Sequence, residues 1–168
     1  MEFYAPWCGH CQAFKEVFEN FAASLKGVAK AGAVNCEAER ELCAKYGVQG
    51  YPTLKLFVEG RAIDYIGDRS PKDMHSFVSE HLPTKHITNL LRPEQLESFL
   101  AEKCKQRGTS WQACVVLLTS KYETSPILKA LSYQFRGKMA FAEARASNQQ
   151  LAKELGVTSF PTLLVICG

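Results

Sequence analysis

The chain has 168 residues, of which 46% are hydrophobic and 22% are charged, and its formal net charge is +3. This length suits one ordinary domain or two small ones. The small charge and the lack of a basic cluster argue against nucleic-acid binding, and no apolar run approaches the ~20 residues of a membrane span. Seven cysteines are more than a cytosolic chain of this size usually carries, which favours an oxidising compartment.

The chain contains an internal repeat. The segment KYGVQGYPTLKLF at residues 45–57 recurs as ELGVTSFPTLLVI at residues 154–166. The shared pattern is Gly-Val, two variable residues, an aromatic residue and Pro-Thr-Leu. It predicts two copies of one fold, divided near EHLPTKHIT, where Pro83 interrupts a polar stretch.

Strands and helices are expected to alternate in the first copy. A strand at 2–4 leads into a helix that begins near Cys8, and apolar side chains at helical spacing predict the buried face of that helix. These side chains are Phe14, Val17, Phe18, Phe21 and Leu25. The elements expected next are a strand at 28–35, a helix at 38–46, a hairpin of strands at 53–58 and 62–65, and a helix at 71–81.

The second copy is expected to begin earlier in the same pattern. Its predicted strands lie at 87–90, 113–119, 138–144 and 162–166, and its predicted helices at 93–103, 126–135 and 148–155. The first copy thus lacks an opening strand and helix, and the second lacks a closing strand and helix. We therefore expect an α/β protein that is a piece of a longer chain.

Cys8 and Cys11 form a Cys-x-x-Cys pair with four chemical interpretations: a zinc site, haem attachment, a structural crosslink and a redox centre. A purely structural crosslink would be expected in a loop rather than at the start of an apolar helix. A zinc site needs four ligands, typically from two such pairs, and Cys36 and Cys43, with six residues between them, do not match a zinc knuckle. Haem attachment needs a histidine directly after the second cysteine, but Gln12 stands there. The sequence therefore favours a redox pair, with no metal.

The position of Cys8 at the start of a helix explains why it would be reactive. Free backbone N–H groups and the positive end of the helix dipole stabilise a thiolate there, and such placement lowers a thiol pKa from about 8.5. His10 can add positive charge or a hydrogen bond. Stabilising the thiolate makes the disulfide a better oxidant, which predicts an oxidant or isomerase rather than a reductase.

Glu2 lies among apolar neighbours in the first predicted strand, six residues before Cys8. It is either a frayed terminal charge or a buried carboxylate. Burial would raise its pKa towards neutrality, and the carboxylate would then accept the proton of Cys11 during thiol exchange.

The segment EFYAPWCGHC, followed some forty residues later by YGVQGYPTLKLF, resembles a catalytic domain of the protein disulfide isomerases, which have the thioredoxin fold. The resemblance covers nearly all of the first copy. It implies that Cys8 is the nucleophile, that Cys11 resolves the mixed disulfide, and that Glu2 is the family's buried carboxylate. It also implies that Pro52 is a cis-proline beside the active site.

The resemblance extends to residues around the pair. It implies that Trp7, Tyr51 and Pro52 contact the substrate, and that Arg69 moves towards the site and lowers the pKa of Cys11. The other interpretation of Arg69 is a solvated charge near a helix start. One departure is Ala33, because many relatives have a lysine at about that place, near the buried carboxylate.

The segment VNCEAERELC resembles a region that carries a second disulfide in some family members. These include the isomerase that partners lectin chaperones and the endoplasmic-reticulum J-domain proteins with several thioredoxin domains. The resemblance implies a structural disulfide between Cys36 and Cys43. The alternative is two buried free thiols.

The second copy aligns Tyr122 with Cys8 and Ser125 with Cys11, so it has no redox pair. It resembles the inactive, substrate-binding thioredoxin domains of the family, and Pro161 keeps the proline. Cys114 and Cys167 are most simply core residues of strands, although a bridge between Cys104 and Cys114 stays open.

The resemblance implies two tandem thioredoxin-like domains, a catalytic one at 1–83 and a truncated, redox-inactive one at 87–168. The expected function is thiol–disulfide oxidation and isomerisation in the endoplasmic reticulum lumen, without a cofactor. Its partners would be unfolded or misoxidised secretory proteins, together with chaperones. The alternative is a substrate-binding or scaffold module of a larger J-domain chaperone. His10 and the cysteine count disfavour a cytosolic reductase.

Overall fold

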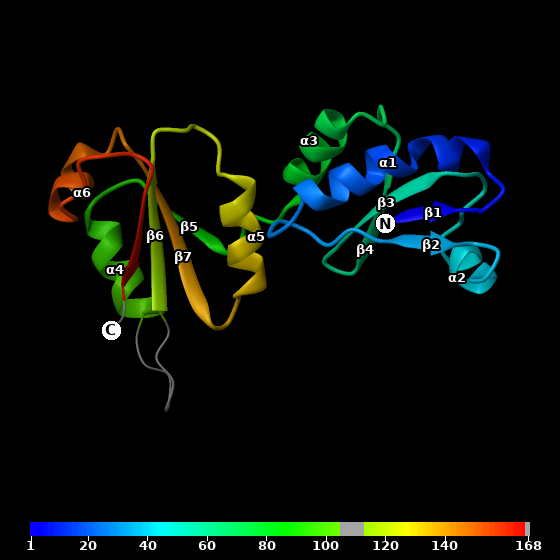
Figure 1. Cartoon of the computed structure of the whole chain (residues 1–168). Helices are drawn as coiled ribbons and strands as arrows, with labels where there is room; N and C mark the ends of the chain where they lie inside the picture. The colour runs from blue at the N-terminus through cyan, green and yellow to red at the C-terminus, as the bar shows by residue number, and fades with distance from the viewer. Residues whose placement is uncertain (105–112, 167–168) are drawn as a thin grey trace. The chain divides into compact units, whose positions relative to one another are not determined.

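The computed structural model describes residues 1–104 and 113–166. The chain divides into two compact units, Met1–Leu82 and Pro83–Gly168. Each unit contains a four-stranded mixed sheet with helices packed against it (Figure 1). Within the described ranges, the structure contains no helix that is both long enough and apolar enough to span a membrane.

Strand β1 lies inside the sheet of the first unit, whose strand order is β2-β1-β3-β4. The elements of this unit are β1 (Glu2–Tyr4), α1 (Gly9–Ser24), β2 (Ala33–Asn35), α2 (Arg40–Lys45), β3 (Thr53–Val58), β4 (Arg61–Tyr65) and α3 (Pro71–His81). Strand β1 pairs in parallel with β2 and antiparallel with β3. Its side chains are therefore flanked by strands on both sides.

Helices α1 and α3 lie along the same face of this sheet (Figure 1). The apolar face predicted for α1 packs against α3 and β3, as its helical spacing requires. The buried residues of this cluster are Phe14, Phe18, Phe21, Leu25, Leu54, Met74 and Val78. The packing fixes α1 over the sheet and so fixes the position of its first turn.

The strand predicted at 28–35 is shorter than expected, because only Ala33–Asn35 pair with β1. The residues before it extend the end of α1, where the amides of Val28 and Ala29 donate to the carbonyl oxygen of Leu25 at 2.8 and 3.0 Å. Ala29 packs against the α1–α3 core, so its apolar character serves helix packing rather than a strand. The other element boundaries lie within two residues of those expected.

The second unit repeats the central pattern of the first. Its elements are β5 (Ile87–Leu90), α4 (Glu94–Lys103), β6 (Ala113–Thr119), α5 (Pro126–Gln134), β7 (Met139–Arg145), α6 (Gln149–Glu154) and β8 (Thr162–Ile166). Strand β6 pairs in parallel with β7 and antiparallel with β8, as β1 does with β2 and β3. The sequence repeat is therefore a structural repeat, and the predicted α/β class is confirmed.

The two units differ in the elements that flank this shared centre. In the described residues, β5 and α4 precede it in the second unit only, and β4 and α3 follow it in the first unit only. In the second unit, α5 packs on one face of the sheet, and α4 and α6 pack on the other (Figure 1).

Cys104 and Cys114 form a disulfide that joins the end of α4 to β6, with their Cα atoms 5.6 Å apart. Cys114 is fully buried in β6, which confirms it as a core residue, and the bridge to Cys104 that the sequence left open is present. Cys167 lies outside the described residues.

Cys36 and Cys43 form a disulfide between the end of β2 and α2, with a Cα–Cα distance of 5.7 Å. Both cysteines are buried in a cluster with Phe3 and Val34. The bridge thus ties the first residue after β2 to the short helix that follows.

Removing this bridge with Cys36→Ala and Cys43→Ala should destabilise the first unit. Closing a loop of about eight residues restricts the unfolded chain by about 2.5 kcal/mol. Hydrogen exchange of β1 and β3 amides, read by mass spectrometry, measures the loss in this unit alone. Unchanged protection of those strands, or alkylation of both wild-type cysteines under non-reducing conditions, would contradict a structural bridge.

Candidate active site

Strand β1 leads the chain directly to the first turn of α1. The backbone N–H of Cys8 donates to the carbonyl oxygen of Ala5 at 3.1 Å, and Cys8 then caps α1 with extended backbone dihedral angles. Its Sγ accepts a hydrogen bond from the backbone N–H of Cys11 at 3.2 Å. The sulfur therefore lies where a helix offers unpaired N–H groups and positive potential, both of which stabilise a thiolate.

Cys8 and Cys11 are joined as a disulfide across this first turn, with their Cα atoms 5.3 Å apart. Both are buried, at 7% and 5% exposure, whereas His10 between them is exposed. The described residues contain no cluster of three or more histidine, cysteine or acidic side chains able to hold a metal ion. The pair is thus a disulfide that closes across the first turn of a helix.

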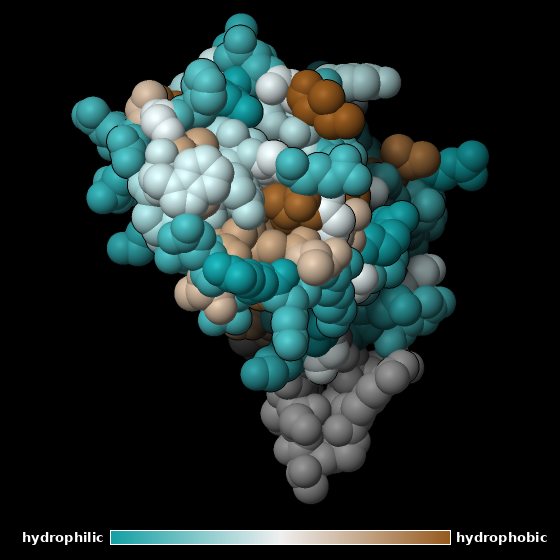
Figure 2. Space-filling model, turned by 90° about the vertical axis from the view of Figure 1, so that its right-hand side faces the viewer, coloured by the Kyte–Doolittle hydropathy of each residue, from teal (hydrophilic) through white to brown (hydrophobic). Residues whose placement is uncertain are grey.

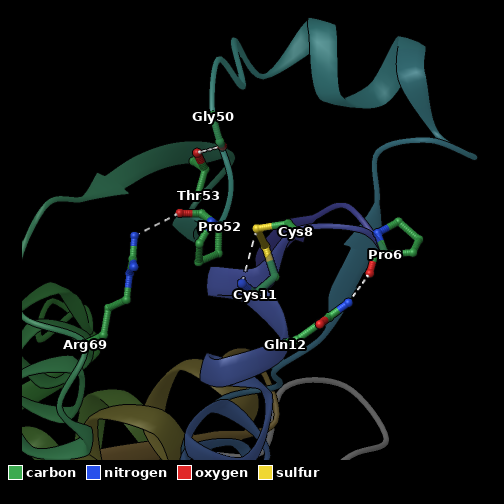
Figure 3. Close-up of a disulfide and its surroundings, with 8 residues drawn as sticks. All are labelled: Pro6, Cys8, Cys11, Gln12, Gly50, Pro52, Thr53 and Arg69. Carbon is green, nitrogen blue, oxygen red and sulfur yellow. Dashed lines mark hydrogen bonds between the residues drawn. A yellow bond between two sulfur atoms is a disulfide. The ribbon is translucent and has the colours of Figure 1, made fainter.

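Pro52 faces the Cys8–Cys11 disulfide from the loop before β3 (Figure 3). The Tyr51–Pro52 peptide bond is cis, and Tyr51 packs against the buried cluster of Ala5, Cys8 and Cys11. Thr53 Oγ1 donates to the carbonyl oxygen of Gly50 at 2.7 Å. This bond braces the loop, so the backbone before Pro52 stays beside the sulfur atoms.

Glu2 is buried in β1, with 5% of its surface exposed. Burial raises the pKa of its carboxyl group above the ordinary value, and the N-terminal ammonium group and Arg69 oppose this rise. Glu2 is therefore a buried carboxyl group rather than a frayed terminal charge.

A cavity of about 430 Å³ joins Glu2 to the redox pair. Cys11 and Glu2 both line it, and so do Ala33 from β2 and Lys15 from the exposed face of α1. The small side chain of Ala33 stands where many relatives were expected to have a lysine. The cavity is wide enough for several water molecules, and these could relay a proton between Cys11 and Glu2.

Arg69 lies just before α3 and reaches the loop of the cis-proline. Its Nη2 donates to the carbonyl oxygen of Pro52 at 3.4 Å (Figure 3), and its guanidinium group lies over the ring of Phe14 at 5.9 Å. In this structure Arg69 therefore contacts the cis-proline loop. Its movement towards Cys11, which the resemblance implies, stays a prediction.

Trp7 is largely exposed directly before Cys8, at 67%. Its indole Nε1 donates to Glu37 Oε1 at 2.7 Å, and its ring packs edge-on against Tyr51. Sequence reasoning missed Glu37, because thirty residues separate it from Trp7. The topology could have indicated this contact. Strands β1 and β2 are parallel, so Trp7 and Glu37, which follow their carboxyl ends, lie at the same edge of the sheet.

In the second unit, Ser125 occupies the place of Cys8. Its side chain caps α5 and accepts a hydrogen bond from the amide three residues on, just as the Cys8 sulfur does in α1. The alignment of Ser125 with Cys11 is therefore wrong by one helical turn. Behind it, buried Glu143 accepts a hydrogen bond from Thr124 and pairs with Arg145, so this site has polar groups but no thiol. The Phe160–Pro161 bond is cis.

Residues 1–80 match the family model described as thioredoxin. The match spans nearly all of the first unit, which is therefore a thioredoxin domain. The chain is also similar in fold to part of ERdj5, as seen in a crystal structure of that protein. The TM-score is 0.59 at 19% identity, and the match covers 99% of this chain and 22% of that chain.

The curated relatives carry a more specific name. The chain is 40% identical over 98% of its length to a protein of Dictyostelium discoideum named putative protein disulfide-isomerase, covering 40% of that protein. It is 43% identical over 98% of its length to protein disulfide-isomerase 2-3 of Arabidopsis thaliana, covering 43% of it. The chain is thus similar over nearly its whole length to proteins named protein disulfide-isomerase, and it spans about two fifths of the length of these relatives.

Replacing Glu2 by Gln should change how stability depends on pH. Since burial raises the pKa of Glu2, the folded chain holds this proton more tightly than the unfolded chain. The advantage to folding is present below the unfolded pKa and is lost as pH rises through the folded pKa. Glu2→Gln stays neutral, so it should exceed wild type in unfolding free energy at pH 8 but not at pH 4.

The gain should be about 1.4 kcal/mol for each pH unit between the two pKa values. Urea unfolding at both pH values measures it, with the exposed Glu16→Gln as the matched control. A Glu2→Gln effect that is equal at pH 4 and pH 8 would show that the carboxylate titrates normally.

Proposed function

We propose that this chain is a thiol–disulfide oxidoreductase and isomerase that forms and rearranges disulfides in secretory proteins. The observation that carries the proposal is Cys8, whose sulfur caps α1 and accepts the Cys11 amide. Its partner thiol is one turn away, and the cis-proline loop lies opposite (Figure 3). No part of this chemistry requires a cofactor.

The exchange proceeds through a mixed disulfide. In reduction, the Cys8 thiolate attacks one sulfur of a client disulfide, forms a bond to it and releases the other sulfur as a thiolate. The Cys11 thiolate then attacks Cys8, so that the client leaves reduced and the site is oxidised by the same two electrons. The reverse sequence oxidises a client dithiol. If a second client thiol attacks instead, the client disulfide is isomerised and the site is unchanged.

Three neighbouring residues would tune these steps. Glu2 takes the proton of Cys11 through the cavity that both residues line, because burial raises the pKa of its carboxyl group and makes it a better proton acceptor. His10 stabilises the Cys8 thiolate from the exposed side of the first turn. Arg69 lowers the pKa of Cys11 after leaving the Pro52 carbonyl oxygen.

The client would bind across Trp7, Tyr51 and Pro52. Trp7 and Tyr51 offer adjoining aromatic surface next to Cys8, and aromatic side chains supply much of the contact energy in protein recognition. Pro52 also lines a groove of about 360 Å³, together with the exposed residues Ile66 and Arg69. An extended polypeptide fits such a surface.

The domain roles follow from the same chemistry. Residues 1–83 would act as the catalytic domain, and residues 87–168 would act as a redox-inactive domain that holds the client. A second candidate function is a binding or scaffold module of a larger J-domain chaperone. Ser125 in the place of Cys8 favours it, because the second unit keeps the proline loop without a thiol.

We place the activity in the endoplasmic reticulum lumen, with chaperones among the partners. Three disulfides in the described residues support an oxidising compartment. A Schizosaccharomyces pombe relative, 32% identical over 89% of this chain and covered over 42% of its own length, carries the word mitochondrial in its name. Fractionation of cells that express the native protein distinguishes the two compartments.

Refolding of scrambled ribonuclease tests the proposed activity. Wild type should accelerate recovery of ribonuclease activity, and Cys8→Ser should reduce the rate to that of buffer alone because the thiol that attacks the client is lost. Cys11→Ser should accumulate a client joined to Cys8, visible by mass under non-reducing conditions.

The control is Cys36→Ala with Cys43→Ala, which keeps the Cys8–Cys11 pair and should remain active at saturating client. Activity that survives Cys8→Ser would refute the oxidoreductase assignment. If Cys8→Ser instead still prevents aggregation of a reduced client at wild-type level while wild type shows no exchange, the scaffold function is the correct one.

A further inference from the structure

The Trp7–Glu37 hydrogen bond holds an exposed side chain beside the nucleophile. Trp7 is 67% exposed, and an unrestrained indole at such a position samples several rotamers, whose loss on binding would weaken affinity. Here the Nε1–H donates to a carboxylate oxygen at 2.7 Å, which is the short distance of a charge-assisted bond. The Tyr51 ring supports the indole from a second direction, at 5.9 Å between centroids.

The backbone of Glu37 is itself held from several sides. Cys36, directly before it, donates its backbone N–H to the carbonyl oxygen of Tyr4 at 2.8 Å and is bridged to Cys43 on α2. The Glu37 amide donates to Asn35 Oδ1 at 3.0 Å. The carboxylate therefore projects from a segment that is tied both to the end of β1 and to α2.

We propose that Glu37 is a positioning residue for client binding, which fixes the Trp7 indole, and that the Cys36–Cys43 disulfide keeps Glu37 in place for this purpose. The inference rests on the proposed function, because it takes Trp7 as a contact for the client. It gives the second disulfide a role in recognition besides stability. The face that carries α2 and the start of α1 is mostly hydrophilic, with small apolar patches (Figure 2). An ordered indole beside Cys8 therefore offers a client apolar contact on a largely polar surface.

The proposal separates two kinds of substrate. A polypeptide disulfide extends past Cys8 and contacts the ordered indole, so its binding depends on Glu37. A small disulfide such as oxidised glutathione has few atoms beyond the reacting sulfurs, so its exchange depends much less on Glu37. The bond from Glu37 ends on Trp7 rather than on a cysteine, so the reduction potential of the Cys8–Cys11 pair should not change.

The decisive variant is Glu37→Ala in the full chain, which removes the acceptor and keeps both disulfides. KM for a peptide disulfide should rise about fivefold, as expected for the loss of one ordered contact. The kcat, the rate with oxidised glutathione and the reduction potential should stay at wild-type values. Glu37→Gln retains an acceptor oxygen, so its KM should lie between those of wild type and Glu37→Ala.

A spectroscopic signature reports the bond itself. In a Trp111→Phe background, the only remaining tryptophan is Trp7, so one indole N–H resonance is observed by NMR. Glu37→Ala should shift this resonance and speed its exchange with water, as should Cys36→Ala with Cys43→Ala. The matched control is Glu39→Ala, two residues on in the same loop, whose side chain makes no capping bond to α2.

The inference is overturned if Glu37→Ala leaves both the indole resonance and the peptide KM at wild-type values, or if Glu39→Ala changes them equally. It is also overturned if KM rises equally for the peptide and for oxidised glutathione. If wild type itself exchanges no peptide disulfide, the proposed function fails as well. If the double cysteine variant does not fold, Glu37→Ala, which keeps the bridge, still decides the case.

Discussion

The hydrogen bond from the Cys11 amide to the Cys8 sulfur is the interaction on which the rest of the site depends. It exists because β1 ends four residues before Cys8 and α1 begins one residue after it. The helix start offers N–H groups without partners, and a thiolate satisfies them better than a neutral thiol does. The packing of α1 against α3 and β3 holds this turn beside the cis-proline loop. The reactivity proposed for Cys8 thus follows from the positions of the strand end and the helix start.

The second unit shows what happens when the same turn lacks sulfur. Ser125 caps α5 with the same hydrogen bond to the third residue on, so the helix start is preserved and the nucleophile is lost. The buried carboxylate of the second unit also lies on a different strand. Glu2 is on β1, whose counterpart is β6, whereas Glu143 is on β7, where it pairs with Arg145. The two units therefore share the strand pairing and the capped helix start, but they differ in the side chain at the cap and in the strand that carries the buried carboxylate.

Much of this organisation could be predicted from the sequence, because its signals are local. The spacing of Phe14, Phe18 and Phe21 predicts the buried face of α1, and the repeated Pro-Thr-Leu segments predict matching third strands. The strand that ends at Asn35 is shorter than the sequence predicts. Apolar residues that pack just beyond the end of a helix have the same sequence pattern as a short strand. Glu37 was missed because its bond to Trp7 depends on parallel pairing of β1 and β2, and the register of Ser125 depends on a loop length that the alignment misjudged.

The account's central claim is that the helix start makes Cys8 a stabilised thiolate. The most direct test is the pKa of Cys8 in the reduced chain, followed through the pH dependence of its alkylation rate, with peptide mass spectrometry to assign the modified cysteine. The account predicts a pKa clearly below the value of about 8.5 for a free thiol, in the range of about 3.5–7.5. A Cys8 pKa at or above about 8.5 would contradict it.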